Sequence, residues 1–399
     1  MKILIVAPVP FFVDRGTPMR ILEESLALEK KDIDITIVTY HLGRDIKTIA
    51  PETKIKISRV HRLLFWYNKK EAGPDWQKII LDIFLIWKTF RNVFLKKPDI
   101  IHAHLHEGVL AGWIVKNIFF WRKIKLVADF HGGLASEMKS HGYLKRGFLE
   151  KIFIFLENTI FSLGDSIIVS SEELRDNIIK KIPAKGGQGN KKITVILDGV
   201  DLNKYKTQRN LSANLKEKEY KDSNKLKVIY SGAFVKNKGI DLFLNSILEI
   251  SKKNLDNIRF ILAGGPIENI KSFIKSNNLE KIVKIVSPLD YKDLPEVNKM
   301  GNIAIDPKTS EVGQASGKIL QYMAAGLPVI CFDRKNNRKY LREAGYYISE
   351  KSSEKITESI LYFLKNPKRI ALMSKISRER AKDFSWEKSA DQIINIYKK

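Results

Sequence analysis

Short apolar runs alternate with helix-like patterns along the chain, and this alternation constrains the fold more than any other feature of the sequence. The predicted strands of the first half are KILIVAP, IDITIVTY, DIIHAHL, IKLVADF, DSIIVSS and KITVILDGV. The predicted helices between them include RILEESLALEKK, the segment from Trp76 to Lys96 and LKRGFLEKIFIFLENTIF. Because alternating strands and helices build parallel βαβ units, the first half is predicted to be a doubly wound α/β domain.

A polar joint separates this half from a second one of the same kind. The pattern lapses between Asp201 and Asn224 and then resumes with the predicted strands LKVIYSG, IRFILAGG, KIVKIVS, NIAIDP and LPVICFD. We therefore predict two Rossmann-like domains that face each other across a central cleft, residues 1–205 and residues 206–385. Since ligands of open α/β sheets bind beyond the carboxyl ends of the strands, we expect the functional site there.

Charge and apolar segments narrow the class of protein. A net charge of +25 over 399 residues favours an anionic partner. The sequence has no zinc-finger spacing, RNP-type sequence or arginine-rich arm, so we expect no nucleic acid partner. One cysteine, Cys331, excludes a disulfide framework and indicates a reducing compartment. The N-terminal run MKILIVAP lacks the cleavage pattern of a signal peptide. Charged residues interrupt the apolar segment from Ile79 to Leu95, which is too short to span a membrane. We therefore expect a cytoplasmic protein that does not cross a bilayer.

Three glycine-bearing junctions are candidate phosphate-binding sites. They are Asp14-Arg15-Gly16-Thr17-Pro18 after the first strand, the stretch from Ser231-Gly232 through Lys236 and Lys238, and Ser316-Gly317-Lys318. Each follows a predicted strand or opens a predicted helix. The first turn of a helix presents free N–H groups and the positive end of its dipole, and a nearby lysine adds a charge. Such junctions suit a diphosphate.

Motifs along nearly the whole chain resemble one known family. They are the glycine loop around Gly16, PDIIHAH, DFHGG, DSIIVSSEEL, VILDGVDLNKY, YSGAFVKNKGID, ILAGGP and KILQYMAAGLPVI. In this order they resemble the GT-B nucleotide-sugar glycosyltransferases, specifically the retaining family 4 type. The most specific element is YMAAGLPV after a small-residue loop, which is similar to the family's donor-site helix. The resemblance implies an α/β fold of the GT-B type and a hexosyltransferase-type activity.

The resemblance implies that the second domain binds a UDP- or GDP-linked sugar, with no other cofactor and no metal. In it, Lys238 and the turn Ser316–Lys318 would hold the phosphates, and Gln321 would lie near the ribose. Lysine and helix N–H groups would neutralise the leaving diphosphate. The full set of implied donor-binding residues is Gly16, Gly232, Lys236, Lys238, Gly264, Gly313, Ser316, Gly317, Lys318 and Gln321.

The resemblance also implies a role for the first domain, which would hold the acceptor. The implied catalytic residues are His131, Lys238 and Glu311, with His131 near the transferred sugar. The final helix, residues 386–399, would pack back onto the first domain. Retention would follow from front-face attack, in which a donor phosphate oxygen helps to deprotonate the acceptor hydroxyl, in contrast to the paired acids of glycosidases.

Three positions depart from the family pattern. Gly313 and Gln321 stand where the family usually has glutamates, and Glu311 could substitute for the first of these. Ala233 stands where the family usually has an arginine, which leaves Lys236 or Lys238 to carry the charge. These departures leave two alternatives open: a degenerate, non-catalytic relative that binds glycan, and a GT-B nucleotide-sugar epimerase.

The histidines of HAHLH carry a separate prediction. On a strand, His102, His104 and His106 would share one face at about 6.5 to 7 Å per step. Two neighbours could share an ion but the outer pair could not, and we expect no metal. We expect His102 to be buried structure, and His106, Glu107 and Arg15 to contact the acceptor.

Aromatic and basic residues are interleaved between Leu63 and Lys125, in LLFWYNKK, IWKTFRNVFLKK and IFFWRKIK. Such a mixture suits an interfacial helix on anionic lipid. The alternative is that these segments are helices flanking the sheet, whose aromatic residues pack into the core and whose lysines face solvent. We expect a peripheral enzyme on the inner face of the cell membrane, with a lipid-linked or surface glycan precursor as its acceptor.

Overall fold

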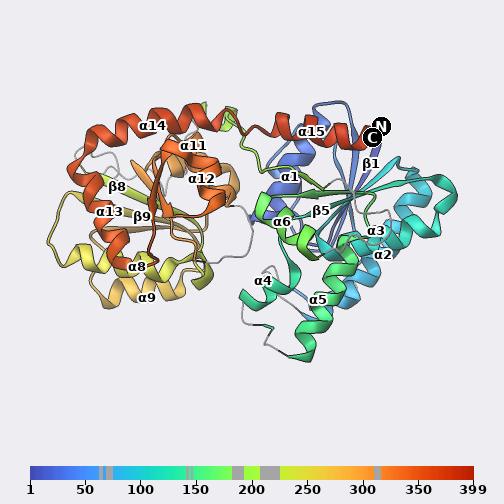
Figure 1. Cartoon of the computed structure of the whole chain (residues 1–399), viewed down its shortest axis with the longest axis horizontal. Coiled ribbons are helices and arrows are strands. Elements are labelled where there is room, and N and C mark those ends of the chain that lie inside the picture. The colour runs from blue at the N-terminus through green and yellow to red at the C-terminus, as the bar shows by residue number, and fades with distance from the viewer. Residues whose placement is uncertain are drawn as a thin grey trace. The chain divides into compact units, whose positions relative to one another are not determined.

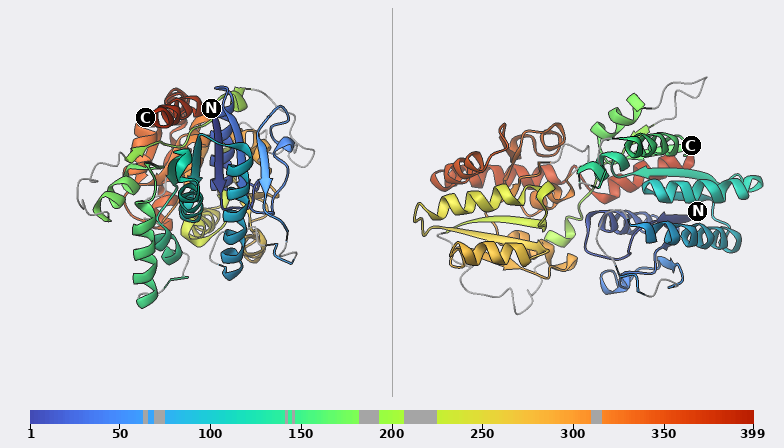
Figure 2. Two further views of the ribbon diagram at one scale, coloured as in Figure 1. Left: turned by 90° about the vertical axis from the view of Figure 1, so that its right-hand side faces the viewer. Right: turned by 90° about the horizontal axis from the view of Figure 1, so that it is seen from below.

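The chain folds into two compact units (Figure 1). The computed structural model describes residues 1–62, 66–68, 75–140, 143–144, 147–181, 193–206, 225–309 and 316–399. Unit 1 comprises Met1–Gly199 together with Trp386–Lys399, and unit 2 comprises the described residues from Val200 to Ser385. Figure 2 shows the strands of each unit between layers of helices.

Unit 1 is built on a parallel sheet whose described strands run in the order β3-β2-β1-β4-β5-β6-β7. Ile5 of β1, for example, lies opposite Ile37 of β2 and His102 of β4. Because helices cover both faces, the central strands are nearly continuous apolar runs. The strands are β1 (Lys2–Ala7), β2 (Asp34–Thr39), β3 (Lys56–Arg59), β4 (Ile100–His104), β5 (Lys125–Phe130), β6 (Ser166–Val169) and β7 (Ile193–Val195).

The helices of unit 1 form two layers. Helix α1 (Gly16–Glu29) packs beside the C-terminal helix α15 (Trp386–Lys398) on one face, and α2 (Trp76–Lys96), α3 (Leu105–Ile118) and α5 (Phe148–Phe161) cover the other (Figure 1). The unit also contains α4 (Leu134–Ser140) and α6 (Glu172–Lys181). In the described part of the chain, no helix combines the length and the apolar content needed to cross a membrane.

Unit 2 repeats this architecture with the strand order β10-β9-β8-β11-β12-β13. The strands are β8 (Leu226–Ala233), β9 (Ile258–Gly265), β10 (Val283–Val286), β11 (Ile303–Asp306), β12 (Val329–Phe332) and β13 (Gly345–Ile348). One face packs on α8 (Ile240–Ser251), α9 (Glu268–Ser276) and α13 (Ser353–Lys365), and the other carries α11 (Gly317–Ala324), α12 (Lys335–Leu341) and α14 (Pro367–Ala381). The short helices α7 (Asn203–Lys206) and α10 (Leu294–Lys299) complete it.

Every strand predicted from the sequence is confirmed, and two further strands were missed. The missed strands, β3 and β13, have four residues each and lie at sheet edges. Their side chains stay largely half-buried or exposed, so neither produces a long apolar run. The prediction that HAHLH forms one strand is wrong at its end. Strand β4 stops at His104, and Leu105 begins α3 with a φ of 61°, which places His106 on a helix.

The strand orders identify a switch point in each sheet, where the chain reverses the direction in which it adds strands. In unit 1 it lies between β1 and β4, and in unit 2 between β8 and β11. Loops that leave the carboxyl ends of such a strand pair diverge to opposite faces, which opens a crevice for a ligand. The residues that follow these four strands are therefore the first place to look for a site.

Candidate functional site

Four cations and one carboxylate gather beyond the carboxyl ends of β8, β11 and β12 in unit 2. Asp306 ends β11, and Lys308 follows two residues later. Lys238 lies in the 3₁₀ turn η5 (Lys236–Lys238), Lys318 in the first turn of α11, and Arg334 at the N-cap of α12. Lys308 is close enough to the other four for their charges to act on its pKa. We call these five residues the basic cluster.

Lys318 is the member of the basic cluster that pairs with Asp306. Its Nζ lies 3.0 Å from Oδ1 of the buried Asp306 and 4.0 Å from the centroid of the Tyr230 ring. Burial opposes ionisation of Asp306, but Lys318 and a hydrogen bond from Ser316 outweigh it and lower the pKa of the carboxyl group. Lys318 therefore organises the site, and the remaining cations supply its net positive charge.

Lys308 is a buried cation of the cluster, and Arg334 is half-buried with buried guanidinium nitrogens. Lys308 is 2% exposed, and burial together with the charges of Lys238 and Arg334 lowers the pKa of its ammonium group to about 7. Nη1 and Nη2 of Arg334 are buried and have no hydrogen-bond partner among the described residues. Buried cations of this kind are stabilised by a bound anion, so the basic cluster is a candidate anion site.

Glycines leave room beside the basic cluster. Gly264, the penultimate residue of β9, has a φ of 141°, and a Cβ there would lie 1.9 Å from the carbonyl oxygen of Gly232. Gly232 has a φ of 136°, and a Cβ there would meet the Nζ of Lys318 at 4.0 Å. At Gly239, with a φ of 75°, a Cβ would lie 1.7 Å from the carbonyl oxygen of Pro307. Gly232 and Gly264 allow the paired ends of β8 and β9 to approach each other closely, and Gly239 does the same for the loops after β8 and β11.

Helix α11 begins beside the same cluster. Ser316 is its N-cap residue, is 7% exposed and makes no capping hydrogen bond. Gly317 is the first helical residue, and Gln321 lies half-buried one turn later. Tyr322 accepts a hydrogen bond of 2.7 Å from the backbone N–H of Ser231, which ties the helix to β8. The first-turn N–H groups thus add to the positive character of the site.

The structure separates the remaining predicted donor residues. Lys236 is exposed, whereas the charge of Lys238, in the same turn, lowers the pKa of Lys308. Of the two lysines that could replace the family's arginine, Lys238 is therefore the one that belongs to the basic cluster. Glu311 and Gly313 lie outside the described residues, and their roles stay predictions.

In unit 1, the loop after β1 leads into α1 at the switch point. Arg15 is the N-cap residue of α1 and is half-buried. Gly16 is exposed, and a Cβ there would meet no described atom within 4 Å. The start of α1 is therefore open enough for a ligand to approach its backbone.

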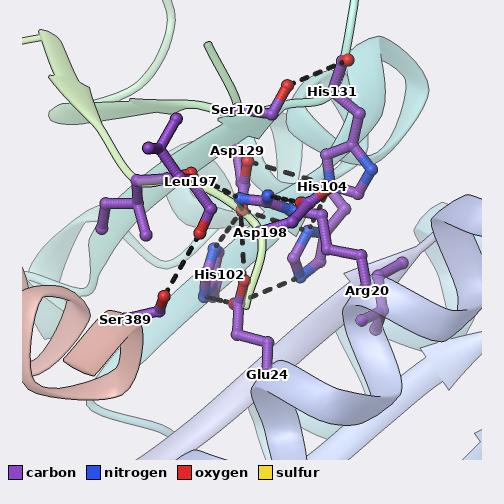
Figure 3. Close-up of polar contacts among 12 residues, drawn as sticks. Arg20, Glu24, His102, His104, Asp129, His131, Ser170, Leu197, Asp198 and Ser389 are labelled. Carbon is purple, nitrogen blue, oxygen red and sulfur yellow. Dashed lines mark hydrogen bonds and ion pairs between the residues drawn. The ribbon is translucent and has the colours of Figure 1, made fainter. Parts of the chain in front are cut away.

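A buried polar group of residues lies one to two turns further along α1 (Figure 3). Arg20 and Glu24 come from α1, His102 and His104 from β4, and Asp129 from β5. All five are at most 5% exposed. Their side chains point toward one another in Figure 3, and we call them the histidine–carboxylate cluster.

Arg20 is the one cation of fixed charge within this cluster. Its Nη2 lies 3.4 Å from Oδ2 of Asp129, and its Nη1 pairs with Asp198. Burial would lower the pKa of Arg20, but the two aspartates outweigh it and raise the pKa. Burial likewise opposes ionisation of Asp129, yet Arg20 holds its pKa well below the usual range. Burial raises the pKa of Glu24 to about 7, and the charge of Asp129 adds to this effect.

His131 joins this cluster to the loop after β5. The Nε2 of His131 lies 3.1 Å from Nδ1 of His104, and Ser170 donates a hydrogen bond of 3.2 Å to its carbonyl oxygen. Burial lowers the pKa of His131 to about 4, although Asp129 acts in the opposite direction. The imidazole is therefore neutral near pH 7, with one nitrogen that donates and one that accepts.

His106 and Glu107 lie apart from this group. His106 is 4% exposed and packs against the rings of Phe130 and Phe161, at centroid distances of 5.1 and 5.2 Å. Burial lowers its pKa to about 3. Glu107 is half-buried in the first turn of α3, where its charge adds to the effect of burial and raises the pKa of Asp82 to about 7. His106 therefore contributes to the core, and only Glu107 is left to reach a ligand.

Several of these residues were not predicted from the sequence. Lys308 and Arg334 each stand two residues beyond a strand that was predicted correctly, NIAIDP and LPVICFD, and that position was the available signal. Arg20, Glu24 and Asp129 were missed because a charged residue on a helix or at a strand end gives no sign of its burial.

Comparison with known proteins assigns the chain to a family. The family model for Glycosyltransferase Family 4 matches residues 15–204, and the model for Glycosyl transferases group 1 matches residues 212–380. The chain is a glycosyltransferase of this family. The two matches follow one another and together span most of the glycosyltransferase.

Relatives and solved structures are consistent with this assignment. An uncharacterized glycosyltransferase of Methanocaldococcus jannaschii is 23% identical over 386 residues, which covers 90% of this chain and 92% of the relative. Sucrose-phosphate synthase from Thermosynechococcus elongatus has a TM-score of 0.76 at 16% identity, with 100% and 98% of the two chains covered. Anabaena HepE, solved in complex with UDP-glucose, has a TM-score of 0.72 at 17% identity, with 99% of each chain covered. These structural likenesses confirm the predicted GT-B fold of this glycosyltransferase.

Proposed function

We propose that this glycosyltransferase uses a nucleoside diphosphate sugar as its donor, and that the basic cluster of unit 2 binds the diphosphate. The observation that carries the proposal is the buried Lys308 together with the half-buried Arg334, whose Nη1 and Nη2 atoms are buried. Lys308 has a pKa lowered to about 7 by burial and by cations around it, and the buried Nη atoms of Arg334 meet no described partner. A diphosphate would place negative charge beside Lys308 and hydrogen-bond acceptors beside the Nη atoms of Arg334.

The same groups would assist the departure of the nucleotide. As the bond between the sugar and the diphosphate breaks, negative charge develops on the bridging oxygen. Lys238, Lys308, Arg334 and the first-turn N–H groups of α11 would stabilise that charge in place of a metal ion. One donor of this kind contributes about 3 kcal/mol to transition-state stabilisation in other enzymes.

Retention of configuration is part of the proposal. The acceptor hydroxyl would attack the anomeric carbon from the face that the diphosphate leaves, and a phosphate oxygen would take the hydroxyl proton. The new glycosidic bond replaces the sugar–phosphate bond, and the proton leaves on the nucleoside diphosphate. This route relies on positioning of both substrates and needs no protein nucleophile. Glu311 keeps its predicted catalytic role in this scheme.

Unit 1 would hold the acceptor and the transferred sugar. The neutral imidazole of His131 can donate a hydrogen bond to a sugar hydroxyl and accept one. The open start of α1 at Arg15 and Gly16, together with Glu107, offers further polar contacts. The HepE complex with UDP-glucose supports a UDP-linked donor, because that chain shares the fold over its whole length.

The acceptor is proposed to be lipid-linked, because unit 1 carries an unusual exposed apolar surface. On α2, the exposed residues Trp76, Ile79, Ile83, Trp87 and Phe94 follow one another at helical spacing, and each is at least 57% exposed. Further exposed apolar side chains lie on or near α3 and α5: Phe120, Trp121, Phe148, Leu149 and Phe155. We call both sets together the aromatic surface.

An anionic bilayer fits the aromatic surface better than a protein partner does. Basic residues accompany the apolar ones on the same helix: Arg91 and Lys97 are exposed, and Lys78, Lys88 and Lys96 are half-buried. Aromatic side chains favour the interface between headgroups and acyl chains, and cations are attracted to anionic headgroups. Such a surface would place the enzyme where a lipid-linked glycan precursor is anchored.

The donor proposal is tested by thermal shift and by nucleotide release. UDP or GDP at 100 times its Kd should stabilise the wild-type chain by about 2.7 kcal/mol, and Lys308→Met should lose most of this effect. Lys271→Met, an exposed lysine of α9, is the matched control and should keep it. The absence of any shift with either nucleotide would contradict the proposal. If nucleotide is released from the nucleotide sugar only when an acceptor is present, the result supports sugar transfer. Conversion of the nucleotide sugar without an acceptor indicates an epimerase.

A further inference from the structure

The histidine–carboxylate cluster of unit 1 is short of positive charge. Glu24, Asp129 and Asp198 bring three carboxylates to it, and within the described residues the guanidinium of Arg20 is the only side chain of fixed positive charge paired with them. Glu24 and Asp129 are 1% and 0% exposed, so water cannot compensate for the difference. When all three carboxylates are ionised, two positive charges in addition to that of Arg20 balance them.

The two histidines of the cluster present free nitrogens in a consistent pattern. His102 uses Nδ1 for Tyr397, at 2.6 Å from its hydroxyl oxygen, and His104 uses Nδ1 for His131, at 3.1 Å from Nε2. The Nε2 atoms of both rings are buried and have no hydrogen-bond partner in the part of the chain that the structure describes, and the same is true of both carboxylate oxygens of Glu24. A histidine that binds a metal through one nitrogen usually fixes its ring through the other.

The spacing of the ligand atoms also suits a metal ion. One ligand atom from each of Glu24, His102, His104 and Asp129 can be chosen so that all four lie within 4.8 Å of one another. Nε2 of His102 lies 3.7 Å from Oδ2 of Asp129, and Nε2 of His104 lies 4.0 Å from Oε1 of Glu24. Bonds of about 2.0–2.1 Å to a tetrahedral zinc ion place its ligand atoms about 3.3 to 3.4 Å apart, so side-chain shifts of under about 1.5 Å would suffice.

We propose that Glu24, His102, His104 and Asp129 form a buried structural site for a divalent transition metal ion of the zinc class. Two imidazoles and two carboxylates form a set of nitrogen and oxygen ligands that zinc accepts in four-coordinate geometry. The charge of +2 balances the excess carboxylate charge left by Arg20. Since the site is closed to solvent, the ion enters as the chain folds and serves structure.

The ion has consequences for two neighbouring elements. Coordination through Nε2 leaves the proton of each histidine on Nδ1, so that His102 donates to the hydroxyl oxygen of Tyr397 and His104 donates to Nε2 of His131. The first bond secures α15 against β4. The second leaves the proton of neutral His131 on its Nδ1, which makes that nitrogen a donor. The metal thereby orients His131 without contact with a substrate.

Elemental analysis of the intact wild-type chain tests the proposal. Protein purified without chelator and passed through gel filtration should contain about one zinc-class ion per chain, and prolonged treatment with a chelator should remove it and lower the Tm. Protein produced with Co²⁺ in place of Zn²⁺ should show the visible absorption of a tetrahedral cobalt site. A wild-type content below about a tenth of an ion per chain, with a Tm that chelator does not change, would overturn the proposal and leave a metal-free polar network.

Variants locate the site. Glu24→Gln and His102→Asn should each reduce the metal content to about a tenth of an ion per chain or less, because each removes one of four ligands. His106→Asn is the matched control, a histidine equally buried but outside the cluster, and it should keep the ion. If Glu24→Gln and His102→Asn both retain the ion, the assignment is wrong. If they do not fold, the wild-type metal content and the cobalt spectrum decide. Nucleotide binding by unit 2 does not enter any of these readouts.

Discussion

Binding of the donor nucleotide should take up a proton at Lys308. In the free protein, burial and the charges of Lys238 and Arg334 lower the pKa of this lysine to about 7. A bound diphosphate would place negative charge beside the ammonium group and raise its pKa again. Above pH 7 the free lysine is mostly neutral and the bound lysine is charged, so affinity should fall as the pH rises.

The size of the effect follows from linkage. With a free pKa of about 7, and with the bound lysine charged throughout, the Kd should rise about eightfold between pH 7.5 and pH 8.5. At pH 8, binding should take up about 0.9 proton per nucleotide. The terminal phosphate of the nucleotide titrates near pH 6 and contributes little over this range.

Isothermal titration calorimetry with UDP or GDP measures both quantities. Titrations in buffers of different ionisation enthalpy give the number of protons taken up, and titrations from pH 7.5 to pH 8.5 give the change in Kd. Lys308→Met should bind more weakly at pH 7.5 and lose the pH dependence, whereas Lys271→Met should behave as wild type. Proton release on binding, or a wild-type Kd that does not depend on pH while binding is detectable, would refute this reasoning.

Three further predictions test other parts of the account. Gly264→Ala should destabilise the chain by about 2 kcal/mol or more, measured as a lower Tm, because its φ of 141° and the oxygen 1.9 Å from the new Cβ both oppose a side chain; an unchanged Tm would contradict the close approach of β8 and β9 at Gly232 and Gly264. Lys238→Ala should weaken nucleotide binding by about tenfold or more, whereas Lys236→Ala, at an exposed position, should change it less than threefold; equal effects would remove the distinction between the two lysines. Trp87→Ser should reduce sedimentation with vesicles that contain anionic lipid, while Leu372→Ser, an exposed residue of unit 2, should not; retention of full binding by Trp87→Ser would count against the aromatic surface.

The sequence predicted the two sheets well because strands buried on both faces are almost uniformly apolar. The side chains of runs such as KILIVAP and IRFILAGG are so uniformly apolar that these runs are expected to be buried in a core. Edge strands such as β3 gave no comparable signal. The end of β4 was missed because the positive φ of Leu105 has no signature in a leucine.

The candidate site was predicted less completely, and the reason differs between the two units. In unit 2, the glycines and lysines near predicted strand ends and helix starts pointed to Gly232, Lys238 and Lys318. The ion pair between Lys318 and Asp306 was not predicted, because only folding brings the two residues together. In unit 1, the polar cluster joins residues as far apart in the chain as His102 and Tyr397. Partners at such a separation could not be matched from local patterns.

The most direct test of the central claim is a crystal structure of the chain with a bound nucleotide sugar. The account predicts that the diphosphate lies beyond the carboxyl ends of β8 and β11, with its oxygens within hydrogen-bond distance of Lys308, Arg334 and the first-turn N–H groups of α11. A nucleotide bound elsewhere, with Lys308 and Arg334 making no contact to phosphate, would contradict it.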